Sequence, residues 1–163
     1  MLRPGIKIRT IQQEDNVPLA RIIRDTLLEF KANRPGTVYY DKTTDHLFEL
    51  FQQPRSVYFV SVLDEAIVGG GGIFPSDGLP DGTCELVKMY LLPEARGIGL
   101  GKKIIEECLN FAKINGYEQV YIESMPELEK ALKVYAQFGF KYISSQLGNT
   151  GHHGCEKWML LKI

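Results

Sequence analysis

The stretch from Cys84 to Lys113 constrains the fold more than any other part of the chain. An apolar run that includes Met89, Tyr90 and Leu91 ends at Pro93, and the turn Arg96-Gly-Ile-Gly-Leu-Gly then leads into an amphipathic helical pattern. A glycine-rich turn at the start of a helix presents free backbone N–H groups, which favour an anion such as a phosphate. The stretch therefore predicts a strand–turn–helix unit with a site for a pyrophosphate at the turn.

The composition predicts one soluble domain that spans 1–163. Its 44% hydrophobic and 24% charged residues are ordinary for a globular protein, and 163 residues are enough to bury a core. A net charge of −1 gives no general attraction to nucleic acid or to an anionic membrane, so we expect neither as a partner. We find no long apolar run for a signal peptide or a membrane span, which predicts a cytoplasmic protein. Three widely spaced cysteines without a C-x-x-C pair indicate reduced thiols and no metal site.

The remaining patterns predict a mixed sheet with helices on its faces, an α/β (α+β) fold. The expected order is β-α-α-β-β-β-α-β-α-β-β: strand 6–10, helices 16–31 and 47–51, strands 56–63, 66–74 and one beginning near 84, a helix ending at Asn115-Gly116, strand 119–123, a helix from Pro126 to Gly139, and strands 140–145 and 156–163. Gly69 to Gly72 lie inside a strand, which indicates a bulge or close approach by another group, or a strongly twisted hairpin.

Two common nucleotide-binding motifs do not fit the glycine turn. The dinucleotide pattern G-x-G-x-x-G starting at Gly97 would need glycine or alanine at Lys102. The P-loop pattern needs Ser or Thr after Gly101-Lys102, where the chain has Lys103, and glycine at Arg96.

Two segments together resemble the GNAT superfamily of acyl-CoA-dependent N-acyltransferases. Arg96, Gly99 and Gly101 match the family signature Gln/Arg-x-x-Gly-x-Gly/Ala, and Ala131 to Phe140 is similar to its Ala-x-x-x-Tyr-x-x-x-Gly-Phe helix. The predicted element order is also that of the family. One position departs, because Leu128 stands where the family often has an asparagine that contacts the cofactor.

The resemblance implies acetyl-CoA as cofactor, with coenzyme A as product. The pantetheine amides would pair with the backbone of the central strand, and the pyrophosphate would bind the turn; the residues implied are Met89, Tyr90, Leu91, Arg96, Gly97, Ile98, Gly99, Leu100, Gly101 and Lys102. In the family this strand separates from its neighbour at that point. Alternatively, Arg96 and Lys102 are solvated residues at the start of the helix and do not bind the cofactor.

The resemblance also implies two catalytic residues, Glu85 as general base and Tyr135 as general acid. Glu85 can instead face solvent or bind substrate, and Tyr135 can instead pack in the core. A nucleophilic role for Cys84 is disfavoured because no histidine stands beside it in a local motif.

The acceptor is the part of the reaction that the sequence specifies least. Tyr39, Tyr40 and Asp41 lie in the connection that borders the acceptor pocket in the family, and His153 follows His152 in the last hairpin loop. Alternatively, Tyr39, Tyr40 and Asp41 only anchor their loop, and the histidines belong to an exposed polar loop. We expect acetyl transfer to a primary amine of a small molecule in a ternary complex. A protein or peptide amine, or a non-catalytic acyl-CoA-binding module, remains open, as do the acyl group, the choice between Glu85 and a loop histidine as base, and the oligomeric state, a homodimer included.

Overall fold

Seven strands form one mixed sheet in the order β1-β2-β3-β4-β5-β7-β6. The computed structural model describes residues 3–163, so the first two residues of the predicted 1–163 domain lie outside the described residues. The mixed α/β fold expected from the sequence is confirmed. The elements, in chain order, are β1 Ile6–Thr10, α1 Asn16–Glu29, α2 Leu47–Leu50, β2 Val57–Leu63, β3 Ala66–Phe74, β4 Thr83–Leu91, α3 Leu100–Ile114, β5 Gln119–Ser124, α4 Glu129–Gln137, β6 Lys141–Ile143 and β7 Lys157–Lys162.

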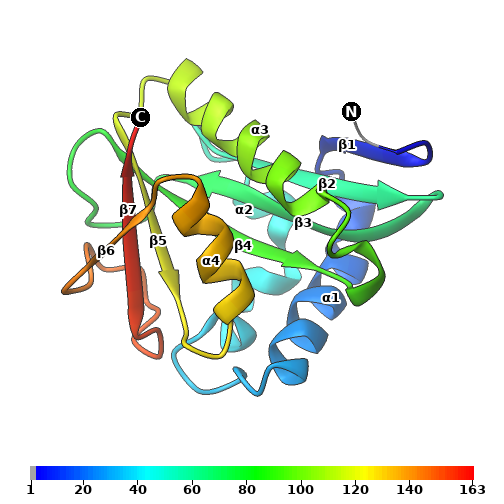
Figure 1. Ribbon diagram of the computed structural model, residues 1–163, viewed down its shortest axis with the longest axis horizontal. Helices are drawn as coiled ribbons and strands as arrows, with labels where there is room; N and C mark the ends of the chain where they lie inside the picture. The colour runs from blue at the N-terminus through cyan, green and yellow to red at the C-terminus, as the bar shows by residue number, and fades with distance from the viewer. Residues whose placement is uncertain (1–2) are drawn as a thin grey trace.

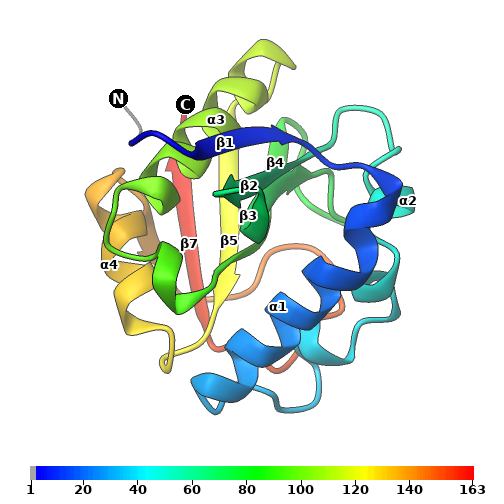
Figure 2. The same cartoon turned by 90° about the vertical axis from the view of Figure 1, so that its right-hand side faces the viewer.

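Helices cover both faces of the sheet, with α1 and α2 on one face and α3 and α4 on the other (Figures 1 and 2). Each face has its own apolar core. The inner sides of α3 and α4 pack into one cluster, which includes Leu100, Ile104 and Leu132. The inner side of α1 packs into the second, which includes Leu19, Ile23 and Leu27. The residues that recur at helical spacing in the sequence therefore form the buried faces of these helices.

Strands β4 and β5 are parallel neighbours, whereas every other pairing in the described sheet is antiparallel. Their pairing runs only from Thr83–Gln119 to Glu85–Tyr121. Beyond Glu85 the two strands diverge, and β4 keeps its partner β3 on the other side as far as Leu91. One edge of β4 is therefore left without a strand partner.

A β-bulge interrupts β4 opposite the run of glycines. Gly70 pairs with Tyr90 but Gly72 pairs with Val87, so two residues of β4 stand opposite Gly71. Lys88 takes the left-handed conformation at φ 52°. A Cβ on Gly71 would lie 2.7 Å from the Met89 sulfur. The glycine run thus combines a bulge with close approach by the protein's own neighbouring strand.

The structure moves some predicted boundaries. The fourth helix begins at Glu129 rather than at Pro126, because Leu128 has a non-helical backbone and closes a turn with its N–H on the Met125 carbonyl. The connection at residues 38–40 forms a 3₁₀ turn, in which Val38 is buried and Tyr40 is exposed. Among residues 3–163, the longest helix, α3, has 15 residues, and none of the helices is long and apolar enough to span a bilayer.

Candidate active site

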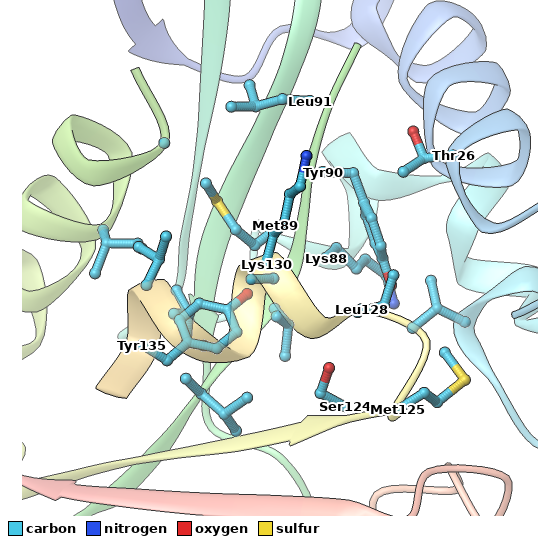
Figure 3. Close-up of a pocket in the computed structure, with 18 of the residues that line it drawn as sticks. Thr26, Lys88, Met89, Tyr90, Leu91, Ser124, Met125, Leu128, Lys130 and Tyr135 are labelled. Carbon is cyan, nitrogen blue, oxygen red and sulfur yellow. The ribbon is translucent and has the colours of Figure 1, made fainter. Parts of the chain in front are cut away.

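The divergence of β4 and β5 opens a cavity of about 840 Å³ between them. Residues 85–91 of β4 form one wall, residues 122–124 of β5 with the adjacent Met125 form another, and α4 closes the side nearest the viewer in Figure 3. Thr26, Glu29 and Phe30 of α1 line the remaining side. The cavity exists because parallel pairing stops at Glu85, so backbone groups of both strands beyond that point face space rather than each other.

At one end of the cavity the glycine turn leads into α3. Gly97 and Gly99 have φ values of 72° and 83°, and a Cβ on either would meet nothing within 4 Å. The first N–H that bonds back along the helix is that of Lys103, on the Gly99 carbonyl at 3.1 Å. The Arg96 N–H donates to the Pro93 carbonyl at 3.2 Å, but the N–H groups from Gly97 to Lys102 have no partner within the described residues, so the turn can accept an anion.

Most of the predicted cofactor residues line this cavity, with two exceptions. The lining includes Met89, Tyr90, Leu91, Arg96, Gly97, Gly99, Gly101 and Lys102. Ile98 packs against the core and Leu100 is fully buried in it, because they begin the apolar stripe of α3. These two can therefore contribute only through their backbone.

Arg96 is tied to α1. Its guanidinium contacts the Glu29 carboxylate at 2.6 Å, donates to the Leu91 carbonyl at 2.9 Å and stacks over the Phe30 ring. These contacts brace the turn against α1. Part of the positive charge of Arg96 is paired with Glu29. Arg96 therefore holds the turn in place in addition to supplying charge to the cavity.

Tyr135 lies on the inner face of α4 and is 6% exposed. Its ring packs edge-on against Phe140, and Figure 3 shows its hydroxyl directed into the cavity. Burial raises the pKa of this hydroxyl above its ordinary value, so it carries its proton at neutral pH. Among residues 3–163 no side chain or backbone group hydrogen-bonds this hydroxyl, which leaves its proton available to a bound ligand.

Glu85 marks the point where the strands separate and is 3% exposed. The Ser76 hydroxyl donates to its carboxylate at 2.5 Å. Burial and the nearby charge of Glu123 raise the pKa of Glu85 to about 7, and the Ser76 hydrogen bond and the charges of His152 and Lys88 oppose that rise. A carboxyl group poised near neutrality can exchange a proton under ordinary conditions.

Beside Glu85, a buried network joins the sheet to the last loop. The oxygen of Glu85, one of Glu123 and a ring nitrogen of His152 all lie within 4.8 Å of one another. His152 also contacts Asp41 through Nε2 at 2.7 Å, and Lys88 reaches Asp41 at 3.4 Å. The end of the cavity near Glu85 therefore has acidic and basic side chains around it, in contrast to the glycine turn at the other end.

Comparison with known proteins agrees with this geometry. The model of the acetyltransferase (GNAT) family matches residues 20–140. This chain belongs to the GNAT family of acetyltransferases. It is 36% identical over 157 residues to the N-acetyltransferase YjgM of Escherichia coli K12, covering 96% of this chain and 94% of that protein.

Solved structures share the GNAT fold. A GNAT acetyltransferase from Staphylococcus aureus Mu50 superposes with a TM-score of 0.82 at 16% identity, covering 96% of this chain and 98% of that one. YncA, an acetyltransferase from Salmonella typhimurium solved with its cofactor acetyl-CoA, gives a TM-score of 0.72 at 19% identity, covering 97% and 94%.

Of the four predicted acceptor residues, the structure brings only Asp41 to the GNAT site. Tyr40 is 58% exposed, and Tyr39 packs edge-on against it near a second, shallower pocket on α1. His153 is exposed outside the cavity, while the adjacent His152 is buried in it. Neighbouring residues of a non-helical loop point different ways, so the choice between the two histidines follows from the loop backbone.

Sequence reasoning missed Glu123, Ser76 and Lys88. It left a loop histidine open as the base but named His153, not His152, among the acceptor residues. Glu123 stands in the predicted strand 119–123, and a carboxylate inside a β-branched and aromatic run is the one signal that could have indicated it. Lys88 reaches the site only because of the bulge in β4, which no local pattern indicates.

Proposed function

We propose that the protein moves an acetyl group from acetyl-CoA to a primary amine on a small molecule, with Glu85 as general base and Tyr135 as general acid. One observation carries the proposal. Glu85 and Tyr135 line the same cavity from β4 and α4, with the free edge of β4 running between the glycine turn and Glu85.

The chain's own groups fit a coenzyme A moiety. The edge of β4 beyond Glu85 has no strand partner, so its remaining free N–H and C=O groups can pair with an extended amide chain. The open space over Gly97 and Gly99 is what a Cβ would fill, and it leaves room for a pyrophosphate against the N–H groups of the turn. When bound, acetyl-CoA supplies the thioester carbonyl that an amine attacks.

Glu85 suits the role of the base. An ammonium group has no free electron pair, so the acceptor must lose a proton before it attacks. The carboxylate of Glu85 is held by Ser76 at the point where β4 and β5 separate and has a pKa of about 7. It can accept that proton at neutral pH while its buried surroundings keep bulk water away.

Tyr135 suits the role of the acid. Its hydroxyl keeps its proton at neutral pH because burial raises its pKa. It projects from α4 into the cavity (Figure 3), where a departing thiolate needs a proton. The packing of its ring on Phe140 fixes the direction of the hydroxyl.

Direct transfer, without an acyl-enzyme, is supported by the state of the thiols. Of the three cysteines only Cys155 lines the cavity, and burial raises its pKa to about 12. Cys84 is fully buried in the core. Because the thiolate is the nucleophile, none of these groups is reactive at neutral pH.

A small acceptor is favoured by the closure of the acceptor end. The 75–82 loop, which carries Ser76, and the 144–156 loop, which carries His152, meet through the Asn149 N–H on the Asp77 carbonyl at 2.8 Å. Gly78 and Gly148 pack so closely there that a Cβ on Gly148 would lie 2.8 Å from the Asp77 carbonyl oxygen. This closure favours an acceptor that enters end-on over an extended peptide that lies across the site.

The test is a screen for coenzyme A release with amino acids, polyamines, aminoglycosides and peptides with free N-termini. Acetylation of one of the small amines supports the proposal. Preferential acetylation of peptides would replace the small molecule by a peptide acceptor. Stabilisation by acetyl-CoA without acetylation of any amine would indicate a binding module instead.

A further inference from the structure

Five ionisable side chains meet at the acceptor end of the cavity. They come from four separate parts of the chain and are Asp41, Glu85, Lys88, Glu123 and His152. Two further titratable groups face them, the Tyr121 hydroxyl and the Cys155 thiol, and burial raises the pKa of each, so both are neutral near pH 7. The charge of the site is therefore decided by the five.

His152 has a carboxylate at each ring nitrogen. Nε2 lies 2.7 Å from Asp41, and Nδ1 lies 3.4 Å from Glu123. A neutral imidazole can donate from only one of its nitrogens, whereas the imidazolium donates from both. This arrangement therefore fits the charged ring, and it leaves neither nitrogen with a free lone pair.

Glu123 and Glu85 differ in how fully they are hydrogen-bonded. Glu123 accepts from the Tyr121 hydroxyl at 3.0 Å, the Gln146 amide at 2.9 Å and the Thr150 hydroxyl, in addition to its contact with His152. Glu85 accepts only from Ser76 among residues 3–163. The donors around Glu123 fix its carboxylate in place, so Glu85 is the carboxyl group that is least constrained.

The charges of the other four groups cancel. Lys88 and His152 are cations, and both contact the anion Asp41, while His152 also contacts the anion Glu123. Glu85 is the fifth group, so the cluster is neutral when Glu85 is protonated and carries one negative charge when it is not. A proton taken by Glu85 from an acceptor thus restores electroneutrality in a buried site.

We propose that His152 is a positioning residue that holds Asp41 and Glu123 as a fixed charged frame and faces Glu85, so that Glu85 is the one carboxyl group of the cluster that exchanges protons with the acceptor. This inference rests on the proposed function, in which Glu85 is the base. His152 does not itself take the proton, because its two nitrogens already donate to carboxylates.

The first test reads the histidines directly and needs no acceptor. The chain has three histidines, so ¹⁵N spectra of the rings can be assigned with His152→Gln and His153→Gln. We expect the His152 ring to keep both protons until about pH 9. In Glu85→Gln it should lose one at lower pH, because the carboxylate that faces it is gone. A neutral His152 ring at pH 7, or a titration that Glu85→Gln leaves unchanged, would overturn the proposal.

The second test uses the pH dependence of kcat/KM with the best amine from the screen. Loss of the facing positive charge in His152→Gln should move the acidic limb upward by about one pH unit or more, while His153→Gln leaves it in place. An unmoved limb in a folded His152→Gln protein means that His152 has a structural role only. If this variant does not fold, Asp41→Asn replaces it. We expect His152 to lose its proton at lower pH in Asp41→Asn, and the same acidic limb of kcat/KM is measured.

The two proposals fail separately. Glu85→Gln with unchanged kcat/KM and pH profile would remove Glu85 from the base role, and with it both proposals. Glu85→Gln with lost activity, together with an unmoved limb in His152→Gln, would leave Glu85 as the base and remove only the role of His152. Loss of activity at all pH values in His152→Gln, with Glu85→Gln active, would make His152 the base.

Discussion

The carboxylates of Glu85 on β4 and Glu123 on β5 face each other within 4.8 Å, at the point where the two strands stop pairing. Two buried carboxylates at this separation do not ionise equally easily. Glu123 is held by several donors, while Glu85 has Ser76 alone among residues 3–163. In our proposal Glu123 is therefore structural, and Glu85 is able to exchange a proton. The first prediction follows from this difference.

Glu85→Gln should lower kcat/KM by about 10²–10⁴-fold, the usual contribution of a general base. In the wild type the rate should rise as pH increases through about 7, because only the ionised Glu85 accepts a proton. The variant should lack this rise. Steady-state kinetics from pH 5.5 to 9 measures both, with the exposed Glu94→Gln as control. A variant that keeps both rate and profile would contradict the base role.

Tyr135→Phe should reduce turnover about 10²-fold or more while acetyl-CoA still stabilises the protein. The ring that packs on Phe140 is kept and only the hydroxyl is lost, so binding and folding are spared. Coenzyme A release and a thermal shift assay with acetyl-CoA separate the two effects. Tyr142→Phe is the matched control, because Tyr142 is 56% exposed on β6. Equal turnover of the Tyr135→Phe variant and wild type would exclude the acid role.

Gly99→Ala should weaken acetyl-CoA binding on the order of tenfold, which corresponds to about 1.4 kcal/mol. The new Cβ would occupy open space over the turn that a pyrophosphate needs. Gly116→Ala is a close control, since its φ of 81° resembles the 83° of Gly99 and it lies beyond the other end of α3. Both variants should lose about 1 kcal/mol of stability from the left-handed backbone. Equal affinity of the two for acetyl-CoA, by calorimetry, would remove the turn from the binding site.

Stability should fall as pH rises from 7 to 9.5. Burial lowers the pKa of His152, but hydrogen bonds to Asp41 and Glu123 outweigh it and raise the pKa to about 9, against an ordinary 6.5. A raised pKa in the folded state contributes stability that is complete below 6.5 and is lost as pH rises through 9. The loss should be about 1–3 kcal/mol, or several degrees in Tm.

Glu85 acts in the same direction at lower pH. Its raised pKa of about 7, against an ordinary 4.5, removes stability as pH rises between those values. Thermal unfolding between pH 7 and 9.5 should show a smaller loss of stability in His152→Gln than in His153→Gln or wild type. An equal decrease in all three would show that His152 is not the titrating group.

Local patterns in the sequence carried the prediction of the sheet-and-helix fold and of the glycine turn. The apolar spacing of α3 and α4 and the position of Tyr135 are set by residues a few positions apart, so they can be read along the chain. Ile98 and Leu100 were predicted as cofactor-binding residues, and their side chains pack in the core, because the motif does not separate backbone contacts from side-chain contacts. The helix start at Glu129 and the exposed position of His153 likewise depend on backbone angles that no pattern specifies.

By itself the sequence determined that this chain has a strand–turn–helix unit with a glycine-rich turn and a buried tyrosine on a later helix, because each depends on spacing within one element. Only the tertiary structure decided how the acceptor end is charged. Asp41 and His152 are 111 positions apart, and they meet because the last loop folds back over the point where β4 and β5 diverge. The charged side chains around Glu85 come from segments that are far apart in the sequence. Only the folded chain brings them within a few ångströms of one another.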